Sequence, residues 1–224
     1  MPAQPPHTIE LLLLKPGELQ PLDAWLALLD DDERTRHTRL RHEADRLAFV
    51  AAHGLLRRAL SLRTPGMDPR AWSFVIGPSG KPSVANSSLR FNLSHCRELV
   101  AVAISRHDEV GVDVEPVNAA LAGEDVAQRV YGPSELAELA ALPAQPRLER
   151  FFERWTVKES WVKATGVGLD DNLPAFEVQL RDGVATCEAP GWQFRYWTPM
   201  IGVKLGLCVA TSSPLDVTPR WWPS

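Results

Sequence analysis

The order of the predicted elements repeats along this chain, and this repeat constrains the fold more than any other feature of the sequence. In the first half, an apolar strand at 8–14 precedes a long helical segment at 43–60. In the second half, a strand at 110–115 precedes a long helix at 147–164. Further strands follow each long helix, at 72–77, 89–94 and 99–105 in the first half and at 175–180, 192–197 and 203–211 in the second.

We therefore predict an α+β fold with pseudo-two-fold, duplicated halves, each a small and mostly antiparallel sheet packed with helices. The halves would be residues 1–107 and 108–224. Because sequence identity between the halves is negligible, the alternative is that their likeness is accidental. Any α+β chain cut in two would give two segments with a broadly similar order of elements. A true duplication would create a cleft between like halves, and ligands commonly bind in such clefts.

Composition limits the class of protein and its compartment. With 224 residues, 45% of them hydrophobic, the chain can bury a sizeable core. The net charge of -4 and the absence of a basic cluster argue against nucleic acid or an anionic membrane as a partner. The three cysteines show no CxxC spacing, which argues against disulfides and structural zinc. We therefore expect a cytoplasmic monomer; the apolar run at 11–14 is too short to cross a bilayer.

The hexapeptide VGVDVE at 110–115 alternates strictly between valine and other residues. On a strand, Asp113 and Glu115 therefore project side by side from one face. Like charges so close need a compensating cation if they are partly buried, and Mg²⁺ accepts carboxylate ligands while keeping positions for water and phosphate oxygens. The alternative is an exposed strand edge with solvated acids.

The stretch RWTVKESWVKATG at 154–166 contains two of the five lysines in the chain. On a helix, Glu159 and Lys163 are spaced i and i+4 and share a face, whereas Lys158 lies about 100° away from Glu159. A surface ion pair is the simple interpretation, but the neighbouring tryptophans make full exposure doubtful. A third carboxylate and an ammonium group near a metal suit phosphoryl chemistry, which depends on positioning and on neutralising charge.

Two shorter stretches add candidate ligands. GPSGKP at 77–82 is a predicted turn that carries Lys81, and FNLSH ends a strand at Ser94 and His95. A lone histidine is more often structural than ligand-binding. The Ser-His pair lacks the G-x-S-x-G elbow that a hydrolase nucleophile would have, so these donors could equally bind phosphate.

Taken in order, GKP, FNLSH, GVDVE and WTVKESWVK resemble the signature of the Sfp-type 4′-phosphopantetheinyl transferases. The resemblance covers nearly the whole chain, and the doubled α+β organisation is similar to the pseudo-two-fold fold of that family. It implies that the first half contributes coenzyme A contacts and that the second carries the metal site and the catalytic helix.

The resemblance also implies roles for individual residues. Asp113, Glu115 and Glu159 match the acids that hold Mg²⁺, for which Mn²⁺ can substitute. Glu159 and Lys163 match catalytic positions, and Lys163 also contacts a phosphate of coenzyme A. The coenzyme A site would further include Lys81, Ser94, His95 and Lys158, with His95 near the 3′-phosphate.

The chain departs from the family pattern at two places. Cys96 stands where the FN-x-SH motif is often followed by serine, and Ala48 replaces a basic residue of the D-R-x-R-F helix motif. Arg46 is thus the candidate ligand of the 3′-phosphate. Possible substitutes are Arg36, Arg39 and Arg41.

The implied reaction transfers the 4′-phosphopantetheine arm of coenzyme A to a serine of an apo acyl, peptidyl or aryl carrier protein and releases 3′,5′-ADP. Either Glu159 or a metal-bound water would accept the serine proton. Two other functions share these residues: a Mg²⁺-dependent phosphohydrolase of coenzyme A or nucleotides, and a non-catalytic binder of carrier proteins.

Overall fold

The computed structural model describes residues 9–85, 87–166, 173 and 176–223. Its strands form two main sheets, with the orders β11-β1-β5-β4 and β6-β10-β9-β8-β7, and a separate β2-β3 hairpin. Among the described strands, β1 and β11 run parallel and the other neighbours are antiparallel. The strands are β1 (Glu10–Leu14), β2 (Phe74–Ile76), β3 (Pro82–Val84), β4 (Arg90–His95), β5 (Val100–Ser105), β6 (Val110–Pro116), β7 (Gln179–Arg181), β8 (Val184–Thr186), β9 (Trp192–Met200), β10 (Val203–Ala210) and β11 (Arg220–Trp221).

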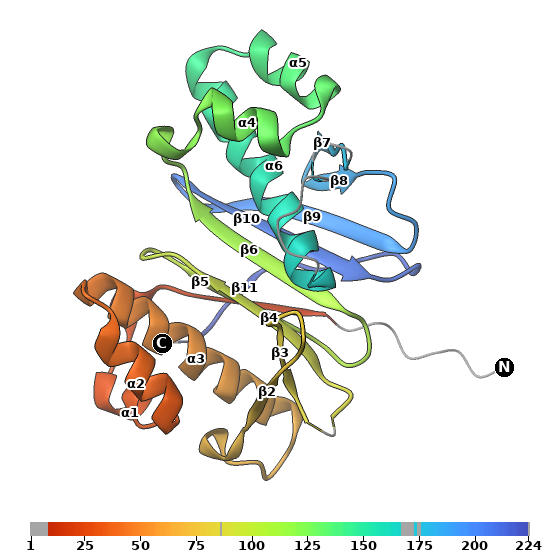
Figure 1. Ribbon diagram of the computed structural model, residues 1–224. Coiled ribbons are helices and arrows are strands. Elements are labelled where there is room, and N and C mark those ends of the chain that lie inside the picture. Colours follow the sequence, from red (N-terminus) through yellow and green to blue (C-terminus); the bar gives the residue numbers. More distant parts are fainter. Residues whose placement is uncertain (1–8, 86, 167–172, 174–175, 224) are drawn as a thin grey trace, which may run out of the picture.

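The elements stack in four layers, in the order α3, first sheet, second sheet and α6 (Figure 1). One core cluster joins α3 to the first sheet, a second fills the space between the two sheets, and a third joins α6 to the second sheet. The helices are α1 (Leu22–Leu26), α2 (Asp31–Arg39), α3 (Glu43–Arg63), α4 (Glu124–Val130), α5 (Pro133–Ala141) and α6 (Ala144–Thr165), with 3-10 turns η1 (Pro16–Glu18), η2 (Pro69–Ala71) and η3 (Ala119–Leu121).

The leucine run of β1 reflects its central place in these layers. Leu12 and Leu14 pack into the cluster under α3, whereas Leu11 and Leu13 pack into the cluster between the sheets. A strand covered on both faces needs apolar side chains at every position rather than at alternate positions. The run is therefore a buried strand.

Helix α6 lies unusually close to the second sheet because glycine occupies the two strand positions beneath it. A Cβ atom at Gly111 would be 1.9 Å from the carbonyl oxygen of Ser160, and one at Gly206 would be 2.3 Å from that of Thr156. The helix ends at Gly166, whose φ of 72° is the left-handed conformation that commonly caps helices. The glycine of the GVDVE motif thus sets the distance between β6 and the helix that carries Glu159 and Lys163.

Side chains of β4 join the two sheets at the edge strand β6. The backbone N–H of Val112 donates to Asn92 Oδ1 at 2.8 Å, and that of Val114 donates to Ser94 Oγ at 3.2 Å. Asn92 and Ser94 therefore replace part of a strand-to-strand ladder, which satisfies backbone donors that would otherwise be buried without partners.

Most predicted elements are present. Helices α3 and α6 and strands β1, β2, β4, β5, β6, β9 and β10 match predicted segments. The strand predicted at 175–180 is shorter, since β7 covers Gln179–Arg181, and residue 175 lies outside the described residues. β3, β8, β11 and α4 are not predicted. None of the described helices combines the length and apolarity that crossing a bilayer requires.

We propose that the chain divides into like halves near residue 107, because each sheet has its own long helix on its outer face. The C-terminal end is an exception to a simple division. β11 pairs with β1 through Leu12 and Leu13, so the last strand of the chain belongs to the first sheet.

Candidate active site

Asp113 is the buried carboxylate at the centre of the site, with 2% of the residue exposed. Lys163 Nζ donates to its Oδ1 at 2.6 Å and to Ser94 Oγ at 2.9 Å, and the Ser94 hydroxyl donates to the same Oδ1 at 3.1 Å. The second oxygen, Oδ2, is buried and has no hydrogen-bond partner. A buried carboxylate oxygen without a partner is unfavourable, which suits this atom to coordinate a cation.

Glu115 and Glu159 lie within electrostatic reach of Asp113. Burial and the charge of Asp113 raise the pKa of each to about 7, and the ammonium of Lys163 only partly opposes this rise. For Glu115, a side-chain hydrogen bond from Trp155 also favours the ionised form. Three acids, two on β6 and one on α6, therefore lie close together with less positive charge than they need at neutral pH.

These acids fit a hard divalent cation. No group of three metal-binding side chains stands assembled among the described residues. However, the partnerless Oδ2 of Asp113 and the two raised carboxyl pKa values show that positive charge here would be stabilising. Carboxylate oxygens with room for phosphate oxygens are the ligands that Mg²⁺ prefers.

Ser94 and His95 are adjacent in sequence but face opposite sides of β4. Ser94 contacts Asp113 and Lys163 at the junction of the sheets, whereas His95 lines a pocket in the first half of the chain. Burial, together with the positive charges of His53, Lys163 and Arg36, lowers the pKa of His95 to about 4 despite the opposing effect of Asp45. His95 is therefore neutral at pH 7.

The pocket beside His95 has a volume of about 640 Å³ and lies between α2, α3, β4 and the β2-β3 hairpin. It combines cationic and aromatic side chains. The Arg36 guanidinium stands over the Phe49 ring at 5.4 Å, and the Phe49 and His53 ring centroids are 4.1 Å apart. The arginines and rings suit an anion attached to an aromatic group, although the acids Asp30, Asp32 and Glu33 line the same pocket. The residues include Arg36, Arg39, Phe49, His53, Phe91 and His95.

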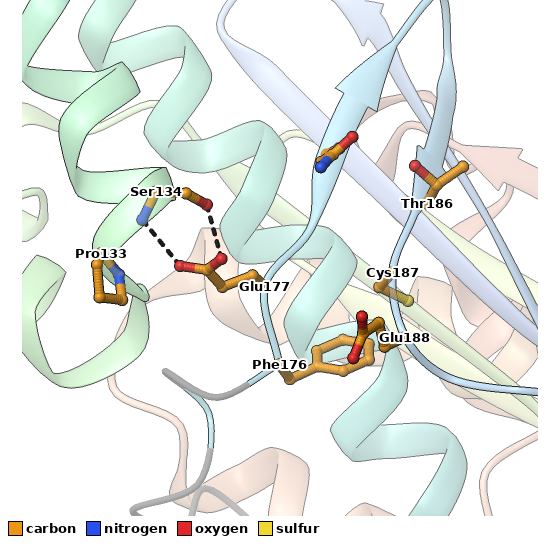
Figure 2. Close-up of a pocket in the computed structure, with 8 residues that line it drawn as sticks. Pro133, Ser134, Phe176, Glu177, Thr186, Cys187 and Glu188 are labelled. Carbon is orange, nitrogen blue, oxygen red and sulfur yellow. Dashed lines mark hydrogen bonds between the residues drawn. The ribbon is translucent and has the colours of Figure 1, made fainter.

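A second cavity, of about 660 Å³, opens between the start of α5 and strands β7 and β8 (Figure 2). Glu177 bridges it by accepting hydrogen bonds from the backbone N–H and the hydroxyl of Ser134, at 2.8 and 2.7 Å. None of the predicted site residues lines this cavity. Its lining consists of Pro133, Ser134, Phe176, Glu177, Gln179, Thr186, Cys187 and Glu188.

Comparison with known proteins decides the family. The model of the 4′-phosphopantetheinyl transferase superfamily matches residues 109–198, which include both acidic motifs. The 4′-phosphopantetheinyl transferase HetI of Nostoc sp. is 32% identical over 202 residues, or 88% of this chain and 83% of the relative. The chain belongs to the 4′-phosphopantetheinyl transferase superfamily. AcpT of Salmonella typhimurium is 31% identical (78% and 81% coverage), and Sfp of Bacillus subtilis is 25% identical (88% and 89%).

Membership in this transferase superfamily confirms the fold class and the enzyme class predicted from the motifs. It also makes coenzyme A, the donor of phosphopantetheine, the substrate that the site has to accommodate.

The structure does not bring Lys158 to the transferase site. Its ammonium group is fully buried and donates to Glu135 Oε2, the Val130 carbonyl and the Leu173 carbonyl, at 2.7, 2.8 and 3.0 Å. All three N–H groups are thus used, and none remains for a cofactor. Lys158 instead ties α6 to the segment around α5, on the side of the helix away from Asp113.

Lys81 also has internal partners. Its ammonium donates to Glu109 Oε2 and to the Ala164 carbonyl, both at 2.8 Å, and to the Val110 carbonyl at 3.3 Å. It therefore links the turn of the β2-β3 hairpin to the C-terminal end of α6. Contact with coenzyme A would require at least one of these bonds to open.

Arg46 points back to the chain that precedes α3. Its Nη1 donates to the carbonyl oxygens of Leu40 and Arg41, at 3.1 and 3.2 Å, just beyond the end of α2. Unlike Arg36 and Arg39, it does not line the pocket beside His95. The geometry therefore favours Arg36 and Arg39 over Arg46 as ligands of the 3′-phosphate.

Sequence reasoning did not identify Glu33 or His53 as parts of this pocket. Glu33 is 5% exposed, lines the pocket and bonds His53 Nδ1 at 2.8 Å. A signal for His53 exists in the sequence: it is a polar residue inside the apolar helical stretch FVAAHGLL. Glu33 has no comparable signal, because it follows Asp30, Asp31 and Asp32, an acidic run that is typical of a solvent-exposed helix start.

Proposed function

We propose that this transferase moves 4′-phosphopantetheine from coenzyme A to the serine hydroxyl of an acyl, peptidyl or aryl carrier protein, in a site built on Asp113, Glu115, Glu159 and Lys163. The single observation that carries the assignment of the site is Asp113: buried, held by Lys163 through one oxygen and without a partner at the other. We further propose a cytoplasmic monomer without a nucleic-acid partner, on composition alone.

Asp113, Glu115 and Glu159 would hold Mg²⁺, or Mn²⁺ in its place. When bound, the ion supplies positive charge for the phosphate oxygens and for the leaving group. Burial and mutual repulsion raise two of the three carboxyl pKa values, and this cost is removed when a cation replaces the protons.

In the transfer step, the serine oxygen forms a bond to the phosphorus next to the pantetheine arm, and the bond from that phosphorus to the bridging oxygen breaks. The bonding electron pair leaves with 3′,5′-ADP. Lys163, whose ammonium lies between Ser94 and Asp113, is placed to donate to a phosphate oxygen as negative charge develops.

We assign the serine proton to Glu159. Glu159 lies within electrostatic reach of Asp113 and Lys163, so its carboxylate is placed near the reacting phosphate. A carboxylate has two oxygens, so contact with a cation through one of them leaves the other able to accept the proton.

The pocket beside His95 would take the nucleotide end of coenzyme A. Arg36 and Arg39 offer positive charge for the 3′-phosphate, and the aromatic lining offers a surface for the base. Because Ser94 and His95 project from opposite faces of β4, the two neighbours would contact different parts of one extended substrate.

Intact-mass spectrometry of apo carrier proteins tests this proposal. After incubation with the transferase, coenzyme A and Mg²⁺, we expect a carrier protein to gain the mass of one phosphopantetheine arm, and we expect EDTA to prevent the gain. Free pantetheine phosphate without any modified protein would identify a phosphohydrolase. Carrier-protein binding without a mass change would identify a non-catalytic binder.

A further inference from the structure

Lys81 follows the turn of the β2-β3 hairpin, but its side chain does not line the pocket beside His95. The residues on both sides of it, Gly80 and Pro82, line that pocket, whereas Lys81 does not. Lys81 lines instead a separate cavity of about 550 Å³, which Glu109 also borders. Because its side chain is only 18% exposed, its ammonium group needs partners inside the protein.

The hairpin turn fixes the backbone that carries this lysine. The N–H of Gly80 donates to the Gly77 carbonyl at 2.9 Å, and the N–H of Gly77 donates to the Lys81 carbonyl at 3.0 Å. Gly80 has a φ of 79°, in the left-handed region that favours glycine. The turn also packs against the end of α6, because a Cβ atom at Gly166 would be 2.5 Å from Ser79 Oγ. The Lys81 backbone is therefore held beside the last turn of α6.

Two of the bonds that Lys81 makes join the elements that carry the acid cluster. Its Nζ donates to the carbonyl oxygens of Ala164 and Val110, at 2.8 and 3.3 Å. Ala164 directly follows Lys163, and its carbonyl is among the last four of the helix, which have no partner within the helix. Val110 is the first residue of β6, the strand that carries Asp113. One ammonium group thus holds α6 and β6 together beside the pair that Lys163 and Asp113 form.

A third bond extends this link to β4. Lys81 donates to Glu109 Oε2 at 2.8 Å, and the other oxygen of Glu109 accepts from Arg90 Nε at 2.9 Å. Arg90 is the first residue of β4, which carries Ser94. The three elements whose side chains meet at Asp113, namely β4, β6 and α6, are therefore all tied to the Lys81–Glu109–Arg90 cluster.

We propose that Lys81 is a positioning residue for the transfer, which sets the distance between Lys163 and Asp113 and does not contact coenzyme A. Glu109 holds its ammonium group in place. This inference rests on the proposed function, because it takes Asp113 and Lys163 to belong to the site of transfer. A misplacement of about 1 Å can reduce a catalysed rate about 100-fold, so a contact at the end of α6 affects the rate without touching the substrate.

Lys81→Met keeps the length of the side chain and removes the ammonium group. Calorimetry with Mg²⁺ measures coenzyme A binding. Single-turnover transfer at saturating coenzyme A measures the rate, with an apo acyl carrier protein that intact-mass spectrometry has shown to be modified. Both are measured at a temperature at which circular dichroism shows the variant to be folded. We expect the rate to fall about tenfold or more, and the Kd of coenzyme A to change less than about twofold.

Lys15→Met is the matched control for this substitution. Lys15 also pairs with a glutamate, Glu18, at 2.9 Å, but it lies beside Trp221 of β11 and not at the acid cluster. Its loss should change neither the rate of transfer nor the binding of coenzyme A.

Glu109→Gln gives a test whose sign separates the two roles of Lys81. If Lys81 were a coenzyme A ligand, loss of Glu109 would free its ammonium group, and coenzyme A would bind several-fold more tightly. If Lys81 positions the site, coenzyme A binding stays unchanged and the transfer rate falls. We expect a fall of roughly threefold, because the Glu109 side chain is 45% exposed and a half-exposed ion pair contributes little.

The proposal is overturned if Lys81→Met transfers at the unsubstituted rate, which would leave Lys81 a structural residue only. It is also overturned if Lys81→Met weakens coenzyme A binding tenfold, or if Glu109→Gln tightens it, since Lys81 would then be a ligand. These outcomes differ from failure of the proposed function. If carrier proteins gain mass while these tests fail, only the role of Lys81 is wrong; if no carrier protein gains mass, the proposed transfer is wrong and the role of Lys81 falls with it.

Discussion

Arg36 and Arg46 are close in sequence, but only Arg36 lines the pocket beside His95, whereas Arg46 is bonded to the carbonyls of Leu40 and Arg41. We expect Arg36→Ala to reduce the preference for coenzyme A over dephospho-coenzyme A by roughly 10- to 150-fold, because a charge-assisted phosphate contact contributes roughly 1.5 to 3 kcal/mol. Arg46→Ala should leave the preference unchanged. Steady-state kinetics with both cofactors measures this preference. A larger effect of Arg46→Ala than of Arg36→Ala would show that Arg46 is the ligand of the 3′-phosphate.

Lys158 and Lys163 also lie close together, and we expect opposite phenotypes for the two. Lys158→Met leaves Glu135 buried beside Arg154 without its lysine, and removing one partner of a buried pair costs about 3 to 5 kcal/mol. Lys163→Met should abolish transfer with a smaller loss of stability, because its side chain is 31% exposed. Chemical denaturation and single-turnover transfer measure the two effects.

The double variant Lys158→Met/Glu135→Gln is the control for the buried pair. It removes the buried Glu135 charge that has lost its lysine and should recover part of the lost stability. If Lys158→Met instead unfolds like the unsubstituted protein but fails to bind coenzyme A, Lys158 is a cofactor ligand and not a structural residue.

At the scale of elements, the site depends on how closely α6 packs on β6. Gly111→Ala would place a Cβ atom 1.9 Å from the backbone oxygen of Ser160 and 2.6 Å from the backbone nitrogen of Ala164, so the helix has to move. We expect a loss of about 3 kcal/mol, and a loss of transfer because Glu159 and Lys163 move away from Asp113. Gly123→Ala is the matched control, since no atom lies within 4 Å of its Cβ position. Equal melting temperatures for the two variants would contradict this account.

At the scale of the whole molecule, the acid cluster links stability to pH. Glu115 and Glu159 have folded-state pKa values of about 7, above the ordinary 4.5, so the folded protein binds more protons between these values. Their contribution to the free energy of unfolding therefore decreases as pH rises from 4.5 through 7. His95 acts oppositely, because its folded pKa of about 4 lies below 6.5, but its contribution is complete above pH 6.5.

We therefore expect the melting temperature of the metal-free protein to fall by roughly 2 to 5 °C between about pH 6.5 and 8. Mg²⁺ should restore it at pH 8 more than at pH 6.5, because fewer protons then compete for the carboxylates. Differential scanning fluorimetry with EDTA and with Mg²⁺ measures both effects. Glu159→Gln should flatten the dependence, and a melting temperature that rises over this window in the unsubstituted protein would rule the linkage out.

The sequence by itself determined the features that depend on local periodicity. The alternation of VGVDVE places Asp113 and Glu115 on one face of β6, and the helical spacing of Glu159 and Lys163 directs both to that face. A further local signal was present but unused: Asp182 and Gly183, with φ of 47° and 78°, form the turn between β7 and β8. An Asp-Gly pair is a strong hairpin signal, since both central residues of such a turn need positive φ.

Tertiary structure alone decided which polar residues serve the site. Helical periodicity places Lys158 and Lys163 on different faces of α6. Only the packing of α5 and Leu173 against the helix shows that Lys158 is buried and fully bonded. Likewise, Glu33 reaches His53 only because α2 folds against α3, and Ser94 reaches Asp113 only because β4 lies beside β6. A side chain's periodicity fixes its direction from its own element, whereas its partners come from segments far away in the sequence, and it is those partners that decide its charge and its role.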